Sequence, residues 1–239
     1  MKKKATVEEI RARFDNDVER FSNLETGQSA TVDAPLVLEL ICQAAAASTN
    51  AARALLDIGC GAGNFTLKLM DRLPRLEQVT LVDLSRPMLE RACRRIGARG
   101  GMAVTPLEGD IREIQLPPES FDIVVAAAVL HHLREEAEWR AVFGAIQRSL
   151  RPGGSFWIAD LIDHELPEIR ELMWRRYGDY LESLKGPEYR DQVLAYVDYE
   201  DTPRSLLFQT DLLRQAGFSR VEVLHKNGCF AAFGAVKTA

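Results

Sequence analysis

The sequence has no long uncharged apolar run. Its longest, Ile123 to Leu130, spans eight residues, whereas a helix that crosses a bilayer needs about 20. The first ten residues, MKKKATVEEI, carry lysines without the apolar segment that a secretory signal requires. These absences argue against a membrane partner and against secretion, so we expect a cytoplasmic protein.

Paired cysteines are also missing. Cys42, Cys60, Cys93 and Cys229 form no Cys-x-x-Cys pair and do not cluster along the chain with the four histidines. This spacing predicts neither a disulfide framework nor a zinc site. We interpret the cysteines as reduced and mostly buried, and we expect no metal.

An excess of positive charge is lacking as well. The 239 residues hold 30 Lys and Arg against 35 Asp and Glu, which gives a formal net charge of −5. Such a balance argues against a nucleic-acid partner and favours a small molecule. The length is sufficient for one large core, in one domain or at most two.

Strand-like runs alternate with helical patterns from residue 53 onward. The runs are ALLDIG, VTLVDLS, MAVTPLEGD, FDIVVAAAV and SFWIADLI. This alternation predicts a parallel sheet covered by helices. The clearest helix precedes the fifth run and is ended by RPGG (151–154); its apolar residues recur at three- and four-residue spacing, namely Trp139, Val142, Phe143, Ile146 and Leu150.

The C-terminal tail has a different pattern. Its two strand-like runs are joined by Asn227-Gly228, a dipeptide that favours a two-residue hairpin turn. The last strand should therefore run antiparallel to its neighbour.

Two segments lie outside the alternating pattern. The sequence pattern of residues 1 to 50 predicts two helices, near Val7 to Phe21 and Val32 to Ala47. Residues 163 to 203 carry eleven acids against five Lys or Arg, together with several aromatic residues. Such an insertion at the carboxyl ends of the strands could cap a site.

The run LLDIGCGAGNF (55–65) places three alternate glycines after the first strand. Gly59, Gly61 and Gly63 lack side chains that a packed element would use, so the backbone must approach something closely. A dinucleotide fingerprint needs glycine at position 64, where the chain has Asn64. This argues against an oxidoreductase that binds a pyrophosphate. A tight turn without a ligand is the alternative.

Acidic residues end the next two strands. Asp83 could accept hydrogen bonds from a ribose diol, although Ser85 and Pro87 also mark an ordinary helix start there. Asp110 could accept from an adenine amine, or serve as a turn residue. With Asp57, these acids would surround a site that no lysine balances. A nucleoside with a cationic centre therefore fits better than phosphates.

The series LLDIGCGAGNF, LVDLSRPML, LEGDIREI, FDIVVAAAVLHHL and LRPGGSFWIADLI resembles the class I S-adenosylmethionine-dependent methyltransferases. The resemblance is strongest over residues 50 to 162. It implies an α/β, doubly wound, Rossmann-like fold with a mostly parallel seven-stranded sheet and an antiparallel last strand. It also implies S-adenosylmethionine as the cofactor.

The resemblance assigns roles to particular residues. It implies that the amino-acid group of the cofactor is held by Asp57 and the loop of Gly59, Cys60, Gly61 and Gly63. It further implies contacts of the ribose with Asp83, of the adenine faces with Leu84 and Ile111, and of the adenine amine with Asp110. Ala127 would offer only its backbone to the cofactor. We therefore predict one methyltransferase domain over residues 1–239. Its parts would be an N-terminal helical lid (1–50), a cofactor-binding core (51–162), a helical insertion or cap (163–203), and a last helix with the terminal hairpin (204–239).

A sulfonium supplies an activated methyl group, so the protein chiefly needs to align an acceptor and exclude water. His131, in VLHHL, is the candidate general base for an acceptor that must lose a proton, with a structural role as the alternative. AAAVLHH lacks the Asn/Asp-Pro-Pro-aromatic motif of relatives that methylate amines of nucleic-acid bases, which favours a small-molecule acceptor. Candidate pocket residues besides His131 are Phe14, Phe21, Trp174 and Tyr177; amphipathic packing is their alternative role.

A second branch of the family is also similar. RFDNDVERF, LLRQAGFSRVEVL and FAAFGAVK resemble the carboxy-S-adenosylmethionine synthase branch, which converts the cofactor itself. That branch uses an arginine for the added carboxylate in the helix before AGF; here the position is Leu212, with Arg214 two places later. A non-catalytic protein that binds S-adenosylmethionine is another alternative, and the sequence leaves a homodimer open.

Overall fold

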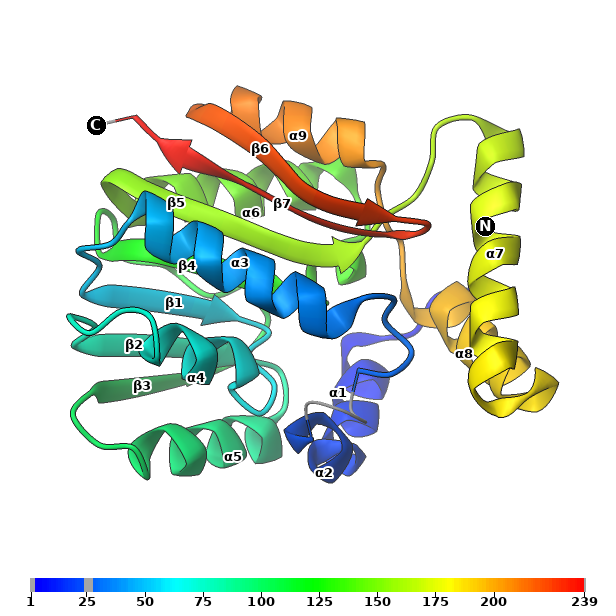
Figure 1. Cartoon of the computed structure of the whole chain (residues 1–239), viewed down its shortest axis with the longest axis horizontal. Helices are drawn as coiled ribbons and strands as arrows, with labels where there is room; N and C mark the ends of the chain where they lie inside the picture. The colour runs from blue at the N-terminus through cyan, green and yellow to red at the C-terminus, as the bar shows by residue number, and fades with distance from the viewer. Residues whose placement is uncertain (1–2, 24–27, 239) are drawn as a thin grey trace.

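The computed structural model describes residues 3–23 and 28–238. These residues form a seven-stranded sheet with helices on both faces (Figure 1). The strand order is β3-β2-β1-β4-β5-β7-β6; β7 is antiparallel to both of its neighbours and the other pairs are parallel. The strands are β1 (Ala54–Ile58), β2 (Gln78–Asp83), β3 (Ala103–Glu108), β4 (Phe121–Ala127), β5 (Leu150–Leu161), β6 (Phe218–Asn227) and β7 (Phe230–Lys237).

Two apolar cores bury the two faces of the sheet. One face is covered by α3 (Ala34–Ser48), α4 (Asn64–Met70) and α5 (Arg86–Gly97), and the other by α6 (Glu136–Ser149) and α9 (Leu206–Gln215). Successive β1 residues serve opposite cores: Leu55 packs with the first group and Leu56 with the second. The central strands are therefore buried on both sides, which explains their continuous apolar sequence.

The N-terminal helical segment is broken where a single helix was expected. It forms α1 (Val7–Asn16) and α2 (Val18–Ser22), separated at Asp17, whose ψ of 10° leaves the helical range. The start of α1 follows its sequence closely, because Thr6 and Glu9 form a capping box. The second expected helix, 32–47, is α3 and begins two residues later.

The terminal hairpin is confirmed, with its turn shifted by one residue. Asn227 pairs with Phe230, so the two loop residues are Gly228 and Cys229. Gly228 has a φ of 55° at the first loop position, where a type II′ turn requires glycine. The Asn227 side chain donates to Asp33 Oδ2 at 2.9 Å. This long-range contact holds Asn227 in the strand.

The acidic insertion forms two helices, α7 (Pro167–Lys185) and α8 (Pro187–Glu200), which pack against each other. Gly186, with a φ of 86°, ends α7, and Pro187 begins α8. Both helices lie beyond the carboxyl ends of the strands, the end at which α1 and α2 also lie (Figure 1). Within the described residues, no helix is both long and apolar enough to cross a membrane.

Candidate functional site

Two adjoining cavities lie at the carboxyl ends of the strands. We call one the loop cavity, because the glycine-rich β1–α4 loop lines it with the ends of β2 and β3. The other is the cap cavity, lined by the ends of β4 and β5 and by residues of α7 and α8. They share six lining residues, namely Phe14, Phe21, Gln28, Phe65, Ala127 and Ala128.

The glycines have a local structural reason. Gly59, Gly61 and Gly63 adopt φ values of 65°, 50° and 81°, which side chains disfavour. A Cβ at Gly59 would lie 2.6 Å from Cβ of Val129, whereas one at Gly61 would meet nothing within 4 Å in the described part of the chain. The loop therefore leaves open space at Gly61, where a ligand can approach the backbone.

Asp83 joins the end of β2 to this loop. Its Oδ2 accepts a hydrogen bond from the Gly61 N–H at 2.8 Å, and its Oδ1 accepts one from the Ser85 N–H at 2.9 Å. Burial raises the pKa of Asp83 to about 6, although both N–H groups favour the charged form. Ser85 also caps α5, so the helix start and the carboxylate at the cavity coexist.

Asp110 lines the loop cavity as an ion pair with Arg112. The carboxylate accepts from the Arg112 backbone N–H at 2.9 Å and from Nε at 3.0 Å, and Arg112 also donates to Glu138 at 2.9 Å. Burial favours the neutral acid, but the bonds with Arg112 outweigh it and lower the pKa of Asp110. A carboxylate in the charged form is suited to accept from an amine, and contact of Asp110 with an adenine amine stays a prediction.

Asp57 lies beneath the loop and lines neither cavity as the described residues outline them. It is 1% exposed and accepts from the Thr66 hydroxyl at 2.7 Å, which joins β1 to α4. Burial raises its pKa to about 7. Gly63 also lies outside the lining, since a Cβ there would face Ala92 at 3.2 Å. Contact of Asp57 or Gly63 with a ligand stays a prediction.

His131 lies in the wall of the cap cavity between two carboxylates. It belongs to the 3-10 turn η1 (Leu130–His132) after β4, and its Nδ1 forms a hydrogen bond with Asp160 at the end of β5. Its Nε2 is 3.6 Å from Asp201 Oδ1. Burial lowers its pKa, but the charges of Asp160 and Asp201 outweigh this and raise it to about 9. His131 therefore carries a proton at neutral pH.

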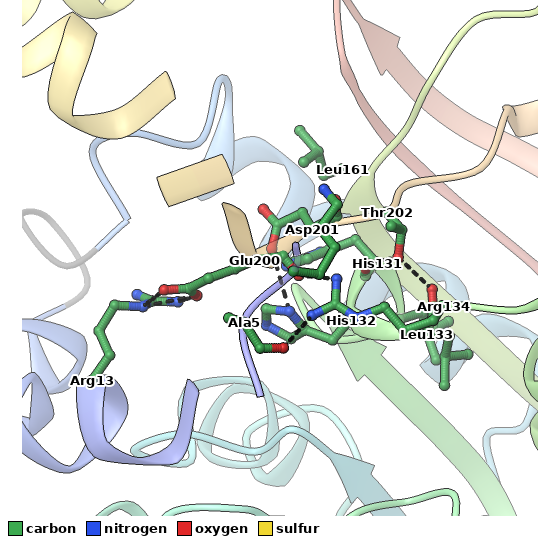
Figure 2. A network of polar contacts seen from close by, with 12 residues as sticks. Ala5, Arg13, His131, His132, Leu133, Arg134, Leu161, Glu200, Asp201 and Thr202 are labelled. Carbon is green, nitrogen blue, oxygen red and sulfur yellow. Dashed lines mark hydrogen bonds and ion pairs between the residues drawn. The ribbon is translucent and has the colours of Figure 1, made fainter. Parts of the chain in front are cut away.

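His132 faces the other cavity, and its pKa is shifted in the opposite direction. It lines the loop cavity, and its Nδ1 is 3.3 Å from the same oxygen of Asp201. Burial and the charge of His131 lower its pKa. Burial opposes ionisation of Asp201, yet the two histidines lower its pKa. Figure 2 shows Asp201 together with both histidines, and Glu200 pointing toward Arg13.

Arg13 connects the N-terminal helices with the insertion across the cap cavity. Its Nε and Nη2 donate to the carboxylate of Glu200 at 2.8 and 2.6 Å. Its guanidinium lies over the rings of Phe14 and Tyr196, 4.3 and 5.0 Å from their centroids. The cavity is thereby closed by segments nearly two hundred residues apart in the chain.

The structure brings most predicted site residues together. Those that line the loop cavity are Gly59, Cys60, Gly61, Asp83, Leu84, Asp110, Ile111 and Ala127. His131 and Tyr177 line the cap cavity, and Phe14 and Phe21 line both. Trp174 was predicted to line the acceptor pocket, but the structure places it elsewhere. It lines an outer groove with Pro167 and Leu194, and its ring packs edge-on against Tyr177.

The structure shows where the two residues lie that were compared with the arginine of the second family branch. Leu212 is 3% exposed in the core, and Arg214 is an exposed partner of Asp211 at 3.0 Å. Among the described residues that line the two cavities, neither is present. Two other arginines, Arg13 and Arg20, line the cap cavity instead.

Several residues of the cap cavity escaped sequence reasoning. Asp160 had a usable signal, because an acid interrupts the apolar run SFWIADLI as Asp57 and Asp83 interrupt theirs. Asp201 had none, and for Arg13 the sequence offered only its place in RFDNDVERF, which predicted no contact with a site. They lie in ordinary charged helical segments, and only the packing of α1 on α8 turns them toward the cavity.

Comparisons with known proteins complete this description. Residues 55–154 match a family model described as a methyltransferase domain. A carboxy-S-adenosyl-L-methionine synthase of Chromohalobacter salexigens is 31% identical over 191 residues, covering 77% of this chain and 68% of that protein. The protein of the same name from Hydrogenovibrio crunogenus is 29% identical over 193 residues, covering 77% of this chain and 72% of that protein.

Solved structures share the fold. Human N-acetylserotonin methyltransferase, in a complex with S-adenosylmethionine, superposes with a TM-score of 0.63 at 18% identity. The match covers 96% of this chain and 57% of that one. At this identity the likeness bears on the fold alone.

Proposed function

The chain belongs to the class I S-adenosylmethionine-dependent methyltransferases, and we propose that it transfers the cofactor's methyl group by in-line displacement to a small-molecule acceptor in the cap cavity. The observation that carries this proposal is the wall that the two cavities share at Phe14, Phe21, Phe65 and Ala127. A donor in one cavity and an acceptor in the other would meet there.

The loop cavity fits the cofactor. The space beside Gly61 admits close approach of a ligand to the backbone, and Asp83 and Asp110 present carboxylates at the two strand ends. The apolar side chains of Leu84 and Ile111 lie in the same lining and suit the faces of an adenine ring. When bound, S-adenosylmethionine supplies a methyl group activated by its sulfonium.

The residues of the chain then need to orient the acceptor and exclude water. Phe14 and Phe21, at the shared wall, are suited to exclude water. His131 is our candidate catalytic residue, because its ring lines the cap cavity and can exchange a proton. It accepts a proton only in its neutral form, so as a general base it requires a pH that approaches its pKa of about 9.

The experiment starts from binding. Isothermal titration of the purified chain with S-adenosylmethionine and with its demethylated product should give saturable binding of both. Incubation with methyl-labelled cofactor and fractions of a metabolite extract should then transfer label to a small molecule. Absence of both binding events would contradict the proposal; binding without label transfer would favour a non-catalytic binding protein.

Conversion of the cofactor itself is the second candidate, favoured by the two relatives named carboxy-S-adenosyl-L-methionine synthase. Because Leu212 and Arg214 lie elsewhere, Arg20 is the better partner for an added carboxylate: it lines the cap cavity, and its Nε has no hydrogen-bond partner in the described residues. Mass spectrometry of the nucleoside that copurifies with the protein separates the two candidates. A carboxylated derivative supports the second; the unmodified cofactor or its demethylated product supports the first.

A further inference from the structure

Three buried side chains converge where the two cavities meet. His131 Nε2 and His132 Nδ1 lie 3.6 and 3.3 Å from Asp201 Oδ1, and the three side chains can each offer one ligand atom within 4.8 Å of the others. Two ligands bound at about 2.1 Å in a tetrahedral site lie roughly 3.4 Å apart. The two separations from Asp201 Oδ1 are therefore close to those of a tetrahedral site, and small side-chain shifts would bring the two histidine nitrogens to the same spacing.

The polar atoms of this cluster are incompletely satisfied. In the residues that the structure describes, His132 Nε2 is buried without a polar partner, and His132 Nδ1 and Asp201 Oδ1 are buried with only the 3.3 Å contact to each other and the 3.6 Å contact of Asp201 with His131. A buried polar group that lacks a partner costs about 1–3 kcal/mol. A native protein rarely leaves several such atoms together unless a water, an ion or a ligand completes them.

Asp160 holds His131 in the orientation that a ligand needs. It bonds Nδ1 of His131, and its two oxygens also accept from the backbone N–H groups of Leu130 (2.8 Å) and Leu161 (2.7 Å). A carboxylate behind one ring nitrogen leaves the other as a donor toward a metal, an arrangement common behind metal-binding histidines. The free nitrogen here, Nε2, is the one that faces Asp201.

We propose that His131 Nε2, His132 Nδ1 and Asp201 Oδ1 bind a divalent transition-metal ion, with Zn²⁺, Co²⁺ or Fe²⁺ as suitable ions. Two imidazoles and one carboxylate suit these ions rather than Mg²⁺ or Ca²⁺, which prefer oxygen ligands. Three protein ligands leave one tetrahedral position open. Because His131 and Asp201 also line the cap cavity, an oxygen atom of the acceptor can take that position.

The metal site adds detail to the proposed function. Binding of the ion does not depend on that function, whereas a role of the ion in methyl transfer rests on it. The ion would replace the proton on His131, which would then act as a ligand and no longer as a general base. Metal binding is consequently weaker at acidic pH, since protons compete for both imidazoles. The groups that face the cluster include Asp160 and Arg13, whose charges affect the pKa values of its members, and Arg134, whose own pKa is affected by the charge of Asp201.

Co²⁺ is the probe for the experiment, because its visible absorption reports the coordination geometry. Tag-free, chelator-treated protein is titrated with Co²⁺ alone, followed by displacement with Zn²⁺. We expect one ion per chain and the intense visible bands of four-coordinate Co²⁺. His132→Ala and Asp201→Asn should weaken binding at least tenfold, and Asp160→Asn, which affects a positioning residue, by about 10- to 100-fold.

His225→Ala is the matched control. His225 also pairs with a carboxylate, with Nε2 2.9 Å from Asp33 Oδ2, but neither residue lines either cavity as the described residues outline them. Its removal should leave the Co²⁺ affinity unchanged. Circular dichroism and cofactor titration check that each variant folds. If Asp201→Asn does not fold, the stoichiometry and the spectrum of Co²⁺ bound to the wild type still show whether the metal site exists.

The outcomes separate the two proposals. Wild-type protein without stoichiometric Co²⁺ binding, or His132→Ala and Asp201→Asn with wild-type affinity, would overturn the metal site. Methyl transfer that persists in chelator with no metal bound would overturn a role of the ion in the reaction while leaving the proposed function intact. Loss of cofactor binding in the presence and absence of metal would instead overturn the proposed function.

Discussion

The loop cavity and the cap cavity are built in different ways. The loop cavity takes its glycine turn and its two carboxylates from successive strand ends, within about fifty residues of each other, and the turn is set by local glycines. The cap cavity joins segments from the two ends of the chain, as in the pair of Arg13 and Glu200. The first kind of site follows from local sequence, whereas the second depends on packing between distant helices. Substitutions in each should therefore affect different properties.

The largest effect is expected for Arg13→Ala. Glu200 is 7% exposed at its side chain and would lose its bidentate partner. An unpaired buried charge costs about 3 kcal/mol, so the free energy of unfolding in urea should fall by about that amount. Arg13→Leu combined with Glu200→Leu should recover a part of it. An unchanged midpoint for Arg13→Ala would show that the pair does not hold the cap.

Asp83→Ala should weaken cofactor binding rather than destabilise the packing of the cap. It removes the acceptor of the Gly61 and Ser85 N–H groups and the carboxylate of the loop cavity. Hydrogen bonds to charged groups contribute about 1.5–3 kcal/mol, so the cofactor Kd should rise by about 100-fold in calorimetry. Glu108→Gln, which alters an exposed ion pair with Arg86, is the control and should bind normally.

Two glycines of the same loop should separate folding from binding. Gly59→Ala combines a positive φ with a 2.6 Å approach to Val129 and should lower the free energy of unfolding by about 2 kcal/mol. Gly61→Ala carries only the backbone strain, about 1 kcal/mol, but its methyl group enters the loop cavity. It should therefore reduce cofactor affinity more than stability. Equal stability losses in both variants would contradict this assignment.

Cofactor affinity should also depend on pH through Asp83. Its pKa of about 6 in the free protein means that about nine in ten molecules are ionised at pH 7 and about one in ten at pH 5. If the ionised form binds, the Kd should be about tenfold higher at pH 5. Folding stability should depend on pH in the opposite direction to cofactor affinity. The contribution of Asp83 to stability is full below the pKa that it has in the unfolded chain, and it is lost as the pH rises through 6. In Asp83→Asn the pH dependence of Kd should be absent.

The smallest effect is expected for Trp174→Phe. The ring lies behind Tyr177, outside the cap cavity, so kcat/KM should stay within about twofold of wild type. Tyr177→Phe is the comparison, because its hydroxyl donates to Ala30 O at 3.0 Å and its ring lines the cavity. A larger loss for Trp174→Phe than for Tyr177→Phe would mean that the acceptor enters by the outer groove.

The sequence determined the fold and the cofactor side of this protein. Alternating apolar runs, the glycines after β1 and the acids that end β2 and β3 specify their structure locally, because strand periodicity and positive φ are properties of a few consecutive residues. For the same reason Asp83 and Ile111 were found where they were expected.

Tertiary structure alone decided the cap cavity. The break at Asp17, the position of the hairpin turn, the outward place of Trp174 and the convergence of Asp201 on the two histidines all depend on contacts between distant segments. Helical periodicity tells which face of α7 or α8 is apolar but not which element packs on it. That choice is made by the burial of the whole chain, and it also sets which charged side chains line the cap cavity.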